Sequence, residues 1–329
     1  MKPKTSTALL AALLAASHTQ GADLRLGIIG CDTSHVTAFT QVLNDPKDKN
    51  HVPGGIVVAA FKGGSSDIPE SANRVEGFAK QLQEKYGVKM VATVAELCEQ
   101  VDAVFLESVD GRPHLEQVRP VLLAHKPVFV DKPVAASLKD VLEIDRIARE
   151  NHTPWFSSSS YRYYASMVEL KNTDAGDVLG ALSYGPCAYE AHHPDFFWYG
   201  IHPVEALFTA MGAGCESVSR VVGTDTDVAT GVWSNGRLGV FRGARNNPKS
   251  YAHSVTLFGS KAVLQQKAGP DDYAPLLVQV MKFFQTGVAP VSNQETIEIY
   301  AFMEAADQSK REGGKPVKLS DVIKQNAAP

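Results

Sequence analysis

Residues 24–35 read LRLGIIGCDTSH, an apolar run that ends at a glycine and is followed by three polar residues. The run Leu24 to Ile29 predicts a buried strand, and Gly30 predicts a tight turn after it. Asp, Thr and Ser next to one another are typical of the first residues of a helix. A strand that turns directly into a helix is the first unit of a dinucleotide-type fold, so we expect a parallel sheet built outward from this strand.

The alternation of strands and helices continues as far as residue 150. Apolar runs at 56–61, 89–91, 103–106 and 128–130 are separated by stretches with helical spacing, one of which predicts a helix over 71–86. Strands that alternate with helices pair in parallel through right-handed crossovers, which predicts a doubly wound sheet. Sheets of this kind bind ligands outside the carboxyl ends of their strands.

The pattern changes near Asn151 to Pro154, where we place a domain boundary, and a helix is predicted over 161–171. From Ala181 to Gln266 the chain consists of short β-favouring runs separated by Gly, Asn and Asp, and Asn235-Gly236 lies between two of them as a strong hairpin signal. Helical stretches follow at 273–286 and 293–312, which predicts an α+β domain on a mainly antiparallel sheet.

Composition limits the possible partners. The 329 residues are 44% hydrophobic, enough for two domains with cores of their own, and the net charge is −4. Such a balance gives no electrostatic footprint for nucleic acid or for an anionic membrane. We therefore expect a small-molecule ligand and no nucleic-acid partner.

The amino terminus departs from this average. Residues 1–21 combine a basic start, an apolar run from Ala8 to Ala16 and small residues at the end, which are the parts of a secretory signal peptide. The run is much shorter than the ~20 residues that a membrane-spanning helix needs, so no membrane anchor is predicted. Cleavage after Gly21 fits best, with Ser17 as the alternative, and the mature protein is expected to be periplasmic or extracellular.

Four cysteines in an exported chain allow two disulfides in three pairings. Cys31, Cys98, Cys187 and Cys215 lie among apolar or small residues, which favours buried free thiols. The C-x-x-C spacing of a zinc ribbon does not occur in the sequence.

The first strand–helix turn is the expected cofactor site. A G-x-G-x-x-G turn would place glycine at positions held here by Gly30, Asp32 and His35, so one glycine of three is kept. The Asp32 carboxylate would repel a pyrophosphate unless it turns away and caps the helix. In the alternative, Asp32 and His35 face the cleft and contact a polar ligand. With Thr33 and Ser34, these residues are the candidate cofactor contacts.

The loop after the second strand has no acid to bind a ribose hydroxyl. It reads Lys62-Gly63-Gly64-Ser65-Ser66, a basic and hydroxyl-bearing sequence that suits a 2′-phosphate. Lys62 and Ser65 therefore become further candidate cofactor contacts, with NADP slightly favoured over NAD. A solvated loop is the other interpretation.

Asp131-Lys132-Pro133 follows directly on the strand at 128–130. A lysine at the carboxyl end of a parallel strand can donate a proton or bind a substrate hydroxyl, whereas a salt-bridged structural lysine is the alternative. Asp131 and Lys132 are also expected to lie beside the cofactor.

Residues 190–205 read EAHHPDFFWYGIHPVE and hold three histidines, three acids and four aromatic residues. Aromatic faces beside hydrogen-bonding groups suit a sugar-like ligand. A metal site at His192, His193, His202 and Glu205 is the alternative, but the spacing matches no tight metal motif and we predict none. The candidate substrate contacts are Tyr161, Arg162, His193, Asp195, Trp198 and His202.

From about Leu24 to Leu319, these motifs resemble the Gfo/Idh/MocA family of glucose-fructose oxidoreductases and inositol dehydrogenases. Asp131-Lys132-Pro133 is similar to the family's E-K-P motif, which implies that Lys132 is catalytic. Residues 199–205 resemble its D-x-G-x-H-x-x-D motif, which implies His202 as a second catalytic residue. Trp198 stands where the family has its catalytic Asp, and the segments at 290–292, 304–309 and 313–317 resemble the family's closing helix.

The resemblance implies a Rossmann-like NAD(P)-binding domain over residues 22–153 and an open-faced sheet domain over 154–329 that binds substrate and forms homo-oligomers. It also implies hydride transfer between bound NAD or NADP and a sugar, cyclitol or glycoside. Two alternatives stay open, namely a cofactor-poor carbohydrate-binding protein that has lost the redox step and a redox-neutral, NAD-dependent glycoside-cleaving enzyme.

Overall fold

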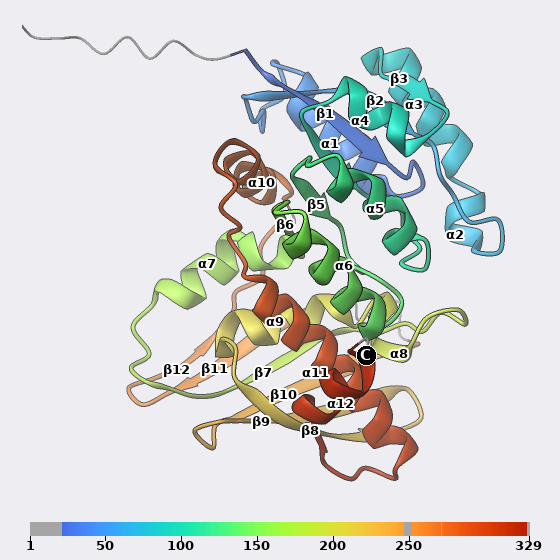
Figure 1. Cartoon of the computed structure of the whole chain (residues 1–329). Coiled ribbons are helices and arrows are strands. Elements are labelled where there is room, and N and C mark those ends of the chain that lie inside the picture. Colours follow the sequence, from blue (N-terminus) through green and yellow to red (C-terminus); the bar gives the residue numbers. More distant parts are fainter. Residues whose placement is uncertain (1–21, 247–251, 271, 328–329) are drawn as a thin grey trace, which may run out of the picture.

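The computed structural model describes residues 22–246, 252–270 and 272–327. The predicted signal peptide at 1–21 lies outside them. Within these three ranges, no helix is long and apolar enough to cross a membrane. The chain builds two sheets with helices packed around them (Figure 1).

The first sheet is parallel throughout, which confirms the predicted doubly wound architecture. Its strand order is β3-β2-β1-β4-β5-β6, so the order reverses between β1 and β4 and opens a crevice at their carboxyl ends. The strands are β1 (Leu24–Ile29), β2 (Gly55–Phe61), β3 (Lys89–Val91), β4 (Ala103–Leu106), β5 (Val128–Val130) and β6 (Trp155–Phe156).

Helices cover both faces of this sheet, and their ends follow local sequence signals. Thr33 caps α1 by accepting the N–H of His35, and Gly87 ends α3 in the left-handed region, at φ +67°. The helix expected over 71–86 is two helices, because the chain breaks at Asn73 and Arg74. The helices are α1 (Ser34–Asn44), α2 (Pro69–Ala72), α3 (Val75–Tyr86), α4 (Val94–Gln100), α5 (His114–Leu123) and α6 (Leu138–Glu150).

The second sheet has the order β12-β11-β7-β10-β9-β8-β13 and is mainly antiparallel, as predicted. The exception is the central pair β7 and β10, which runs parallel because the chain crosses over through two helices and two strands between them. The predicted hairpin joins β9 to β10, with Gly236 at φ +79°. The strands are β7 (Val178–Pro186), β8 (Cys215–Val222), β9 (Thr226–Trp233), β10 (Leu238–Ala244), β11 (Ser254–Gly259), β12 (Val263–Gln265) and β13 (Val317–Lys318).

Helices pack on one face of this sheet, above it in Figure 1. The single helix expected over 161–171 is a 3-10 turn followed by a short α-helix. The remaining elements are η1 (Ser160–Tyr163), α7 (Ala165–Asn172), α8 (Asp195–Trp198), α9 (Ile201–Met211), α10 (Ala274–Thr286), α11 (Asn293–Arg311) and α12 (Leu319–Asn326), of which α10 packs against the first half of the chain and not on this sheet.

One helix from late in the chain completes the core of the first half. Leu277 and Val280 of α10 are fully buried in the same cluster as Phe105 of β4 and Phe129 of β5. Aromatic pairs run through this cluster, and Phe284 meets Phe105 edge to face at 5.2 Å between ring centroids. This shared packing joins the first half of the chain to a helix that follows the second sheet. All four cysteines are buried free thiols, as the sequence favours.

Candidate functional site

A cleft of about 410 Å³ opens at the carboxyl edge of the first sheet, where the second half of the chain meets it. That volume lies within the ~300–1,000 Å³ typical of small-molecule sites. Its walls come from the start of α1, the loops after β4 and β5, η1, and the segment around α8 and α9. The lining includes Thr33, Ser34, His35, Arg74, Lys132, Tyr161, Trp198, Tyr199, His202 and Tyr273.

Lys132 reaches this cleft from the loop after β5, as its position in the sequence predicts. Its backbone N–H donates to Oδ1 of Asp131 at 2.9 Å, and the Lys132-Pro133 peptide bond is cis. The first domain thus presents a lysine at the place where its sheet faces the second half of the chain.

His202 faces Lys132 from the first turn of α9. Its Nδ1 lies 2.7 Å from Oγ of Ser159, and its side chain is largely buried. Burial, together with the positive charge of Lys132, holds the pKa of His202 well below its usual value. His202 is therefore a neutral imidazole at neutral pH and can accept a proton.

Glu205 and Arg162 support this side of the cleft from behind. Glu205 accepts hydrogen bonds from Oγ of Ser158 at 2.6 Å and from the N–H of Ser159 at 2.7 Å. Arg162 donates to Glu205 at 3.0 Å and to Glu295 of α11 at 2.6 Å. Arg162 is thus held in buried ion pairs and does not line the cleft, which corrects its expected role as a substrate contact.

His35 lines the cleft, as one of the two interpretations of the glycine-poor turn expects. Its Nδ1 lies 2.6 Å from Oδ2 of Asp131, and its ring stacks on Phe39. Asp131 itself is buried, so it reaches the cleft only through His35 and the backbone of Lys132.

Asp32 does not face the cleft. Its carboxylate is fully buried and accepts hydrogen bonds from Oγ of Ser71 at 2.6 Å and from the N–H of Val109 at 3.0 Å. The helix cap is Thr33 and not Asp32, which corrects the expected capping role. Because the carboxylate points between the loops after β2 and β4, it leaves the first turn of α1 open to a ligand.

Lys62 and Ser65 also lie away from the cleft. Lys62 pairs with Glu76 of α3 at 2.5 Å, and both side chains are exposed. Ser65 donates to Oδ2 of Asp110 at 2.6 Å. The basic group that does line the cleft from this region is Arg74, which the sequence pattern does not reveal because it places this residue within a single helix over 71–86.

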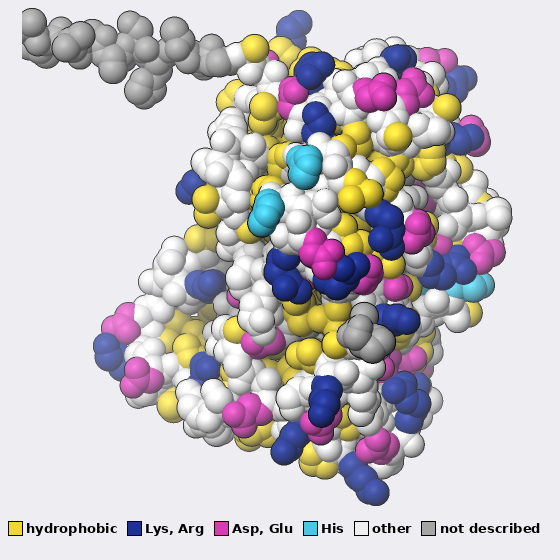
Figure 2. Space-filling model, in the orientation of Figure 1, with side chains coloured by type: hydrophobic (Ala, Val, Ile, Leu, Met, Phe, Trp, Pro, Cys, Tyr) yellow, Lys and Arg dark blue, Asp and Glu magenta, His cyan; other side chains and the backbone are white. Residues whose placement is uncertain are grey.

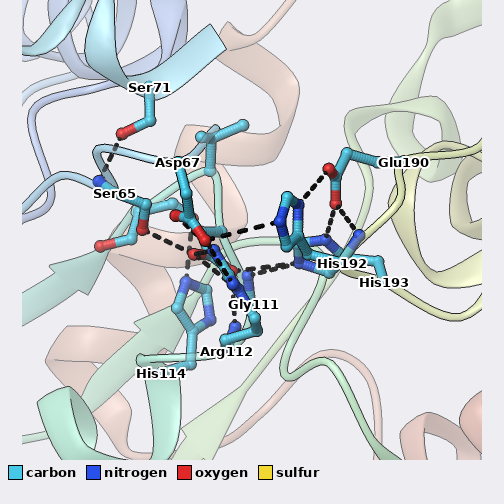
Figure 3. Close-up of polar contacts among 12 residues, drawn as sticks. Ser65, Asp67, Ser71, Gly111, Arg112, His114, Glu190, His192 and His193 are labelled. Carbon is cyan, nitrogen blue, oxygen red and sulfur yellow. Dashed lines mark hydrogen bonds and ion pairs between the residues drawn. The ribbon is translucent and has the colours of Figure 1, made fainter. Parts of the chain in front are cut away.

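His193 belongs to a polar cluster between the two halves of the chain (Figure 3). Its Nδ1 lies 2.7 Å from Glu190, and its Nε2 accepts the N–H of Gly111 at 3.1 Å and lies 3.2 Å from Oδ1 of Asp110. Its side chain is fully buried there, so it holds the loop after β7 against the loop after β4. His193 is a contact between domains and does not line the cleft.

Asp195 is also outside the cleft, contrary to the expectation for the aromatic stretch. It forms ion pairs with Arg220 of β8 and with Lys310 of α11, each at 2.7 Å. Trp198, three residues further on, lines the cleft and packs against the His193 ring at 4.9 Å between centroids. Within the described residues, no group of three or more His, Cys, Asp or Glu side chains is placed to hold a metal ion.

The geometry fits a nicotinamide cofactor on the side of the cleft formed by α1. The first turn of this 11-residue helix, with Thr33 and Ser34, lines the cleft, and Arg74 adds a positive charge nearby. Free N–H groups at a helix start attract phosphate, and Asp32 is turned away from them. Gly30 holds the required turn at φ +87°, where a side chain would collide with the backbone of Ser108.

A parallel doubly wound domain followed by a mainly antiparallel sheet, with a lysine and a histidine meeting between them, defines a class of two-domain oxidoreductases. Residues 24–158 match the Gfo/Idh/MocA family, which is described as an oxidoreductase family with an NAD-binding Rossmann fold. The resemblance predicted from the sequence is therefore confirmed, and the first half of the chain carries the NAD-binding Rossmann fold of that family.

Three known proteins show the extent of the likeness. An uncharacterized oxidoreductase of Streptococcus pneumoniae serotype 4 is 24% identical over 162 residues, and the match spans 44% of each chain. A probable dehydrogenase from Thermotoga maritima superposes with a TM-score of 0.74 at 23% identity, over 91% of this chain and all of the other. A scyllo-inositol dehydrogenase from Lactobacillus casei, solved with NAD(H) and scyllo-inositol, superposes with a TM-score of 0.70 at 15% identity. The superposition covers 91% of this chain and 99% of the other. These superpositions confirm the two-domain fold.

Proposed function

We propose that this protein transfers a hydride between bound NAD(P) and a CH–OH group of a sugar, cyclitol or glycoside. The single observation that carries the proposal is that Lys132 and His202, from the two halves of the chain, face one cleft beside the open first turn of α1. The inositol dehydrogenase from Lactobacillus casei, which shares the fold, holds NAD(H) and a cyclitol.

Lys132 and His202 have different roles in removing the proton of the substrate hydroxyl. The bound nicotinamide would supply the hydride acceptor. The substrate hydroxyl must lose its proton as the C–H bond breaks, and neutral His202 is able to take it. The Lys132 ammonium then stabilises the negative charge that grows on the substrate oxygen, or exchanges roles with His202 as the base.

Aromatic side chains favour a polyhydroxylated ligand. Tyr161, Tyr199 and Trp198 line the same cleft as the two proposed catalytic residues. Aromatic faces pack against the C–H face of a sugar ring while its hydroxyls need polar partners, which Lys132 and His202 provide. We therefore place the substrate ring between these aromatic residues and the loop after β5.

NADP remains slightly favoured over NAD in this proposal, on the basis of charge. Lys62 pairs with Glu76 across two exposed side chains, and exposed pairs contribute only about 0 to 1 kcal/mol. A 2′-phosphate can therefore replace Glu76 as the partner of Lys62 at small cost. Arg74, which lines the cleft, is a second cation in the same region.

Cofactor titration tests the proposal. The full chain is purified, gently denatured and examined by mass spectrometry for released NAD(H) or NADP(H), and the folded protein is titrated with each cofactor. We expect one of them to bind, and Lys132→Met to lower turnover on a responsive sugar by about 100-fold or more. The absence of both co-purified and titratable cofactor at millimolar concentration would refute the oxidoreductase proposal.

A second candidate is a cofactor-poor carbohydrate-binding protein. The observation that favours it is Trp198, which lines the cleft at the position of the family's catalytic Asp. A redox-neutral, NAD-dependent cleavage of glycosides is the third possibility and uses the same cleft. Sugar binding without any nicotinamide binding selects the second candidate, and release of an aglycone without net cofactor reduction selects the third.

Export and self-association complete the proposal. The short apolar amino terminus supports export to the periplasm or beyond the cell, and the open sheet supports a homo-oligomer. Val232, Leu238, Phe258 and Val263 are 37–64% exposed and follow one another across neighbouring strands in register, with Gly180 between them. Partners in a β ladder point to the same face, so these side chains form one apolar row on the sheet.

A further inference from the structure

A second imidazole lines the cleft, at the third glycine position of the dinucleotide turn, where the family motifs assign no base. His35 stands in the first turn of α1, and its Nδ1 lies 2.6 Å from Oδ2 of Asp131. The ring stacks on Phe39, with centroids 5.1 Å apart, and meets the edge of Tyr273 at 4.9 Å. These contacts fix the orientation of the imidazole, and 13% of its side chain remains exposed at the cleft.

Asp131 determines which nitrogen of His35 is available. Although burial opposes its ionisation, His35 and Lys132 lower the pKa of Asp131 to about 2, so the carboxylate is charged. A carboxylate only accepts hydrogen bonds, so Nδ1 of His35 carries the hydrogen. Nε2 is then the basic nitrogen, and no hydrogen bond among the described residues engages it.

The groups around His35 are those that a catalytic base needs beside it. A carboxylate paired with an imidazole fixes the tautomer and the orientation of the ring, as in catalytic triads. Lys132 adds a cation to the same cleft, and His202 adds a neutral imidazole. Oγ of Ser159 accepts the N–H of Tyr161 at 3.2 Å and lies 2.7 Å from Nδ1 of His202, so its own hydrogen can go to that nitrogen. In that tautomer Nε2 of His202 carries the hydrogen and donates to a ligand. In the other tautomer Nδ1 donates to Ser159, and Nε2 can accept the proton of a substrate hydroxyl.

We propose that this cleft also catalyses proton exchange next to the carbonyl group of a polyhydroxy ketone, with His35 as the base and without a nicotinamide cofactor. The C–H bond next to the carbonyl breaks, and its proton moves to Nε2 of His35. The electron pair forms the carbon–carbon double bond of an enediolate, and the negative charge on oxygen is stabilised by Lys132 and by the N–H of His202. Return of a proton to the carbon restores the ketone, with no net oxidation.

The substrate class of this second activity rests on the proposed function, because oxidation of a sugar or cyclitol alcohol produces such a ketone. The two activities differ in what they require. Hydride transfer needs NAD(P), whereas proton exchange needs only the ketone and the side chains of the cleft. Asp131 does not reach the substrate and acts through His35 as a positioning residue.

Deuterium exchange tests the proposal directly. The full chain, shown by mass spectrometry to hold no nicotinamide, is incubated in D₂O with fructose and separately with the ketone of an inositol. Proton NMR follows the loss of the signal next to the carbonyl group. We expect exchange faster than in buffer alone, and His35→Gln is expected to slow it by about 100-fold or more.

Matched variants separate a catalytic role from a structural one. His152→Asn removes an exposed histidine before β6, at the opposite edge of the sheet, and should exchange at the wild-type rate. Added imidazole should restore exchange to His35→Ala, which loss of packing alone would not allow. Asp131→Asn should slow exchange, because the Asn amide can donate to Nδ1 of His35 and so favour the tautomer whose hydrogen is on Nε2.

The outcomes are distinguishable from those of the proposed function. Exchange that needs no cofactor, falls in His35→Gln and returns with imidazole supports the inference whether or not NAD(P) binds. No exchange above the buffer rate with either ketone overturns it, even if hydride transfer with NAD(P) is found. Equal exchange by wild type and His35→Gln also overturns it, because another group must then be the base.

Discussion

Arg162 of η1 lies between two carboxylates, with its Nε 3.0 Å from Glu205 of α9 and its guanidinium also 2.6 Å from Glu295 of α11. Side-chain exposure is 11% for Arg162 and 5% for Glu205, so the pair is shielded from water. Three elements that are far apart in the sequence are therefore tied together directly behind His202, which stands on the same helix as Glu205.

Replacement of Arg162 should destabilise the protein strongly. Arg162→Met leaves Glu205 as a buried charge without its cation, and removing one partner of a buried pair costs about 3 to 5 kcal/mol. Urea unfolding measures the loss. The double variant Arg162→Met with Glu205→Gln should recover part of it, because the remaining amide is uncharged. A change below about 1 kcal/mol in the single variant would contradict the assignment of this pair as a buried one.

Asp32 gives a prediction about the glycine-poor turn. Asp32→Gly restores the second glycine of a dinucleotide turn but removes the acceptor for Ser71 and for the N–H of Val109. Each buried donor left without a partner costs about 1 to 3 kcal/mol, so the variant should be less stable than the wild type. Asp32→Asn retains one acceptor oxygen, so its stability should lie between that of the wild type and that of Asp32→Gly. Thermal unfolding of the three proteins in parallel checks this order.

The affinity of the same variants for NAD(P) gives a second test of where the Asp32 carboxylate points. Because the Asp32 carboxylate points away from the first turn of α1, the charge-neutral variants should not gain NAD(P) affinity by more than a few-fold. A large gain, measured by titration under conditions where all three proteins are folded, would mean that the carboxylate does face the phosphate site.

Glu107 should make the free energy of unfolding decrease as the pH rises. It follows β4, is fully buried, and its carboxyl oxygens have no hydrogen-bond partner among the described residues. Burial, with the negative charges of Asp131 and Asp32, raises the pKa of Glu107 well above its usual value. The folded state therefore keeps a proton that the unfolded state releases above its ordinary pKa near 4.5, so stability falls as the pH rises from there toward the folded pKa.

Glu107→Gln tests this dependence, since the amide cannot ionise and nearly matches the neutral acid in shape. The free energy of unfolding of the variant, measured from pH 5 to pH 9, should fall less steeply than that of the wild type. Exposed Glu116→Gln on α5 serves as the control and should follow the wild-type curve. Parallel curves for wild type and Glu107→Gln would show that Glu107 is ionised in the folded protein.

The sequence predicted the elements of the fold well because each has a local signal. The strand ending at Gly30 and the hairpin at Gly236 appear almost where the pattern predicts them. Lys132 and His202 could be predicted as cleft residues because a position at the end of a parallel strand and one at a helix start both carry a local signal. The export signal, the oligomer and the choice of cofactor remain predictions.

The residues that the sequence misplaced are those whose partners come from another part of the chain. Arg162, His193 and Asp195 are polar residues that the sequence predicts as substrate contacts, but each is bound by a charged group from a distant element: Glu295, Asp110 and Lys310 respectively. Tyr273 lines the cleft because α10 returns to the first half of the chain, which no local pattern reveals. Sequence spacing therefore predicts reactive side chains near the end of a strand. Only the tertiary contacts decide which of these side chains line the cleft and which are held in ion pairs elsewhere.

Two faces of the molecule differ in how well they could form an interface between copies of the chain. Figure 2 shows basic and acidic side chains close together on the face that carries α6, where Arg146 pairs with Glu143 and Glu150. The apolar row of Val232, Leu238, Phe258 and Val263 instead offers a continuous hydrophobic surface on the second sheet. Burial of such a row against a second copy gains about 25 cal/mol for each Å² removed from water.

The double variant Leu238→Lys with Phe258→Lys should therefore shift the full chain toward the monomer, because it places two like charges in the centre of the proposed interface. Light scattering coupled to size exclusion measures the mass over a range of concentrations. Val278→Lys, on the exposed side of α10, is the matched control and should leave the mass unchanged. An oligomer that persists in the double variant would place the interface on another surface, whereas a wild-type monomer at high concentration would remove the proposed oligomer altogether.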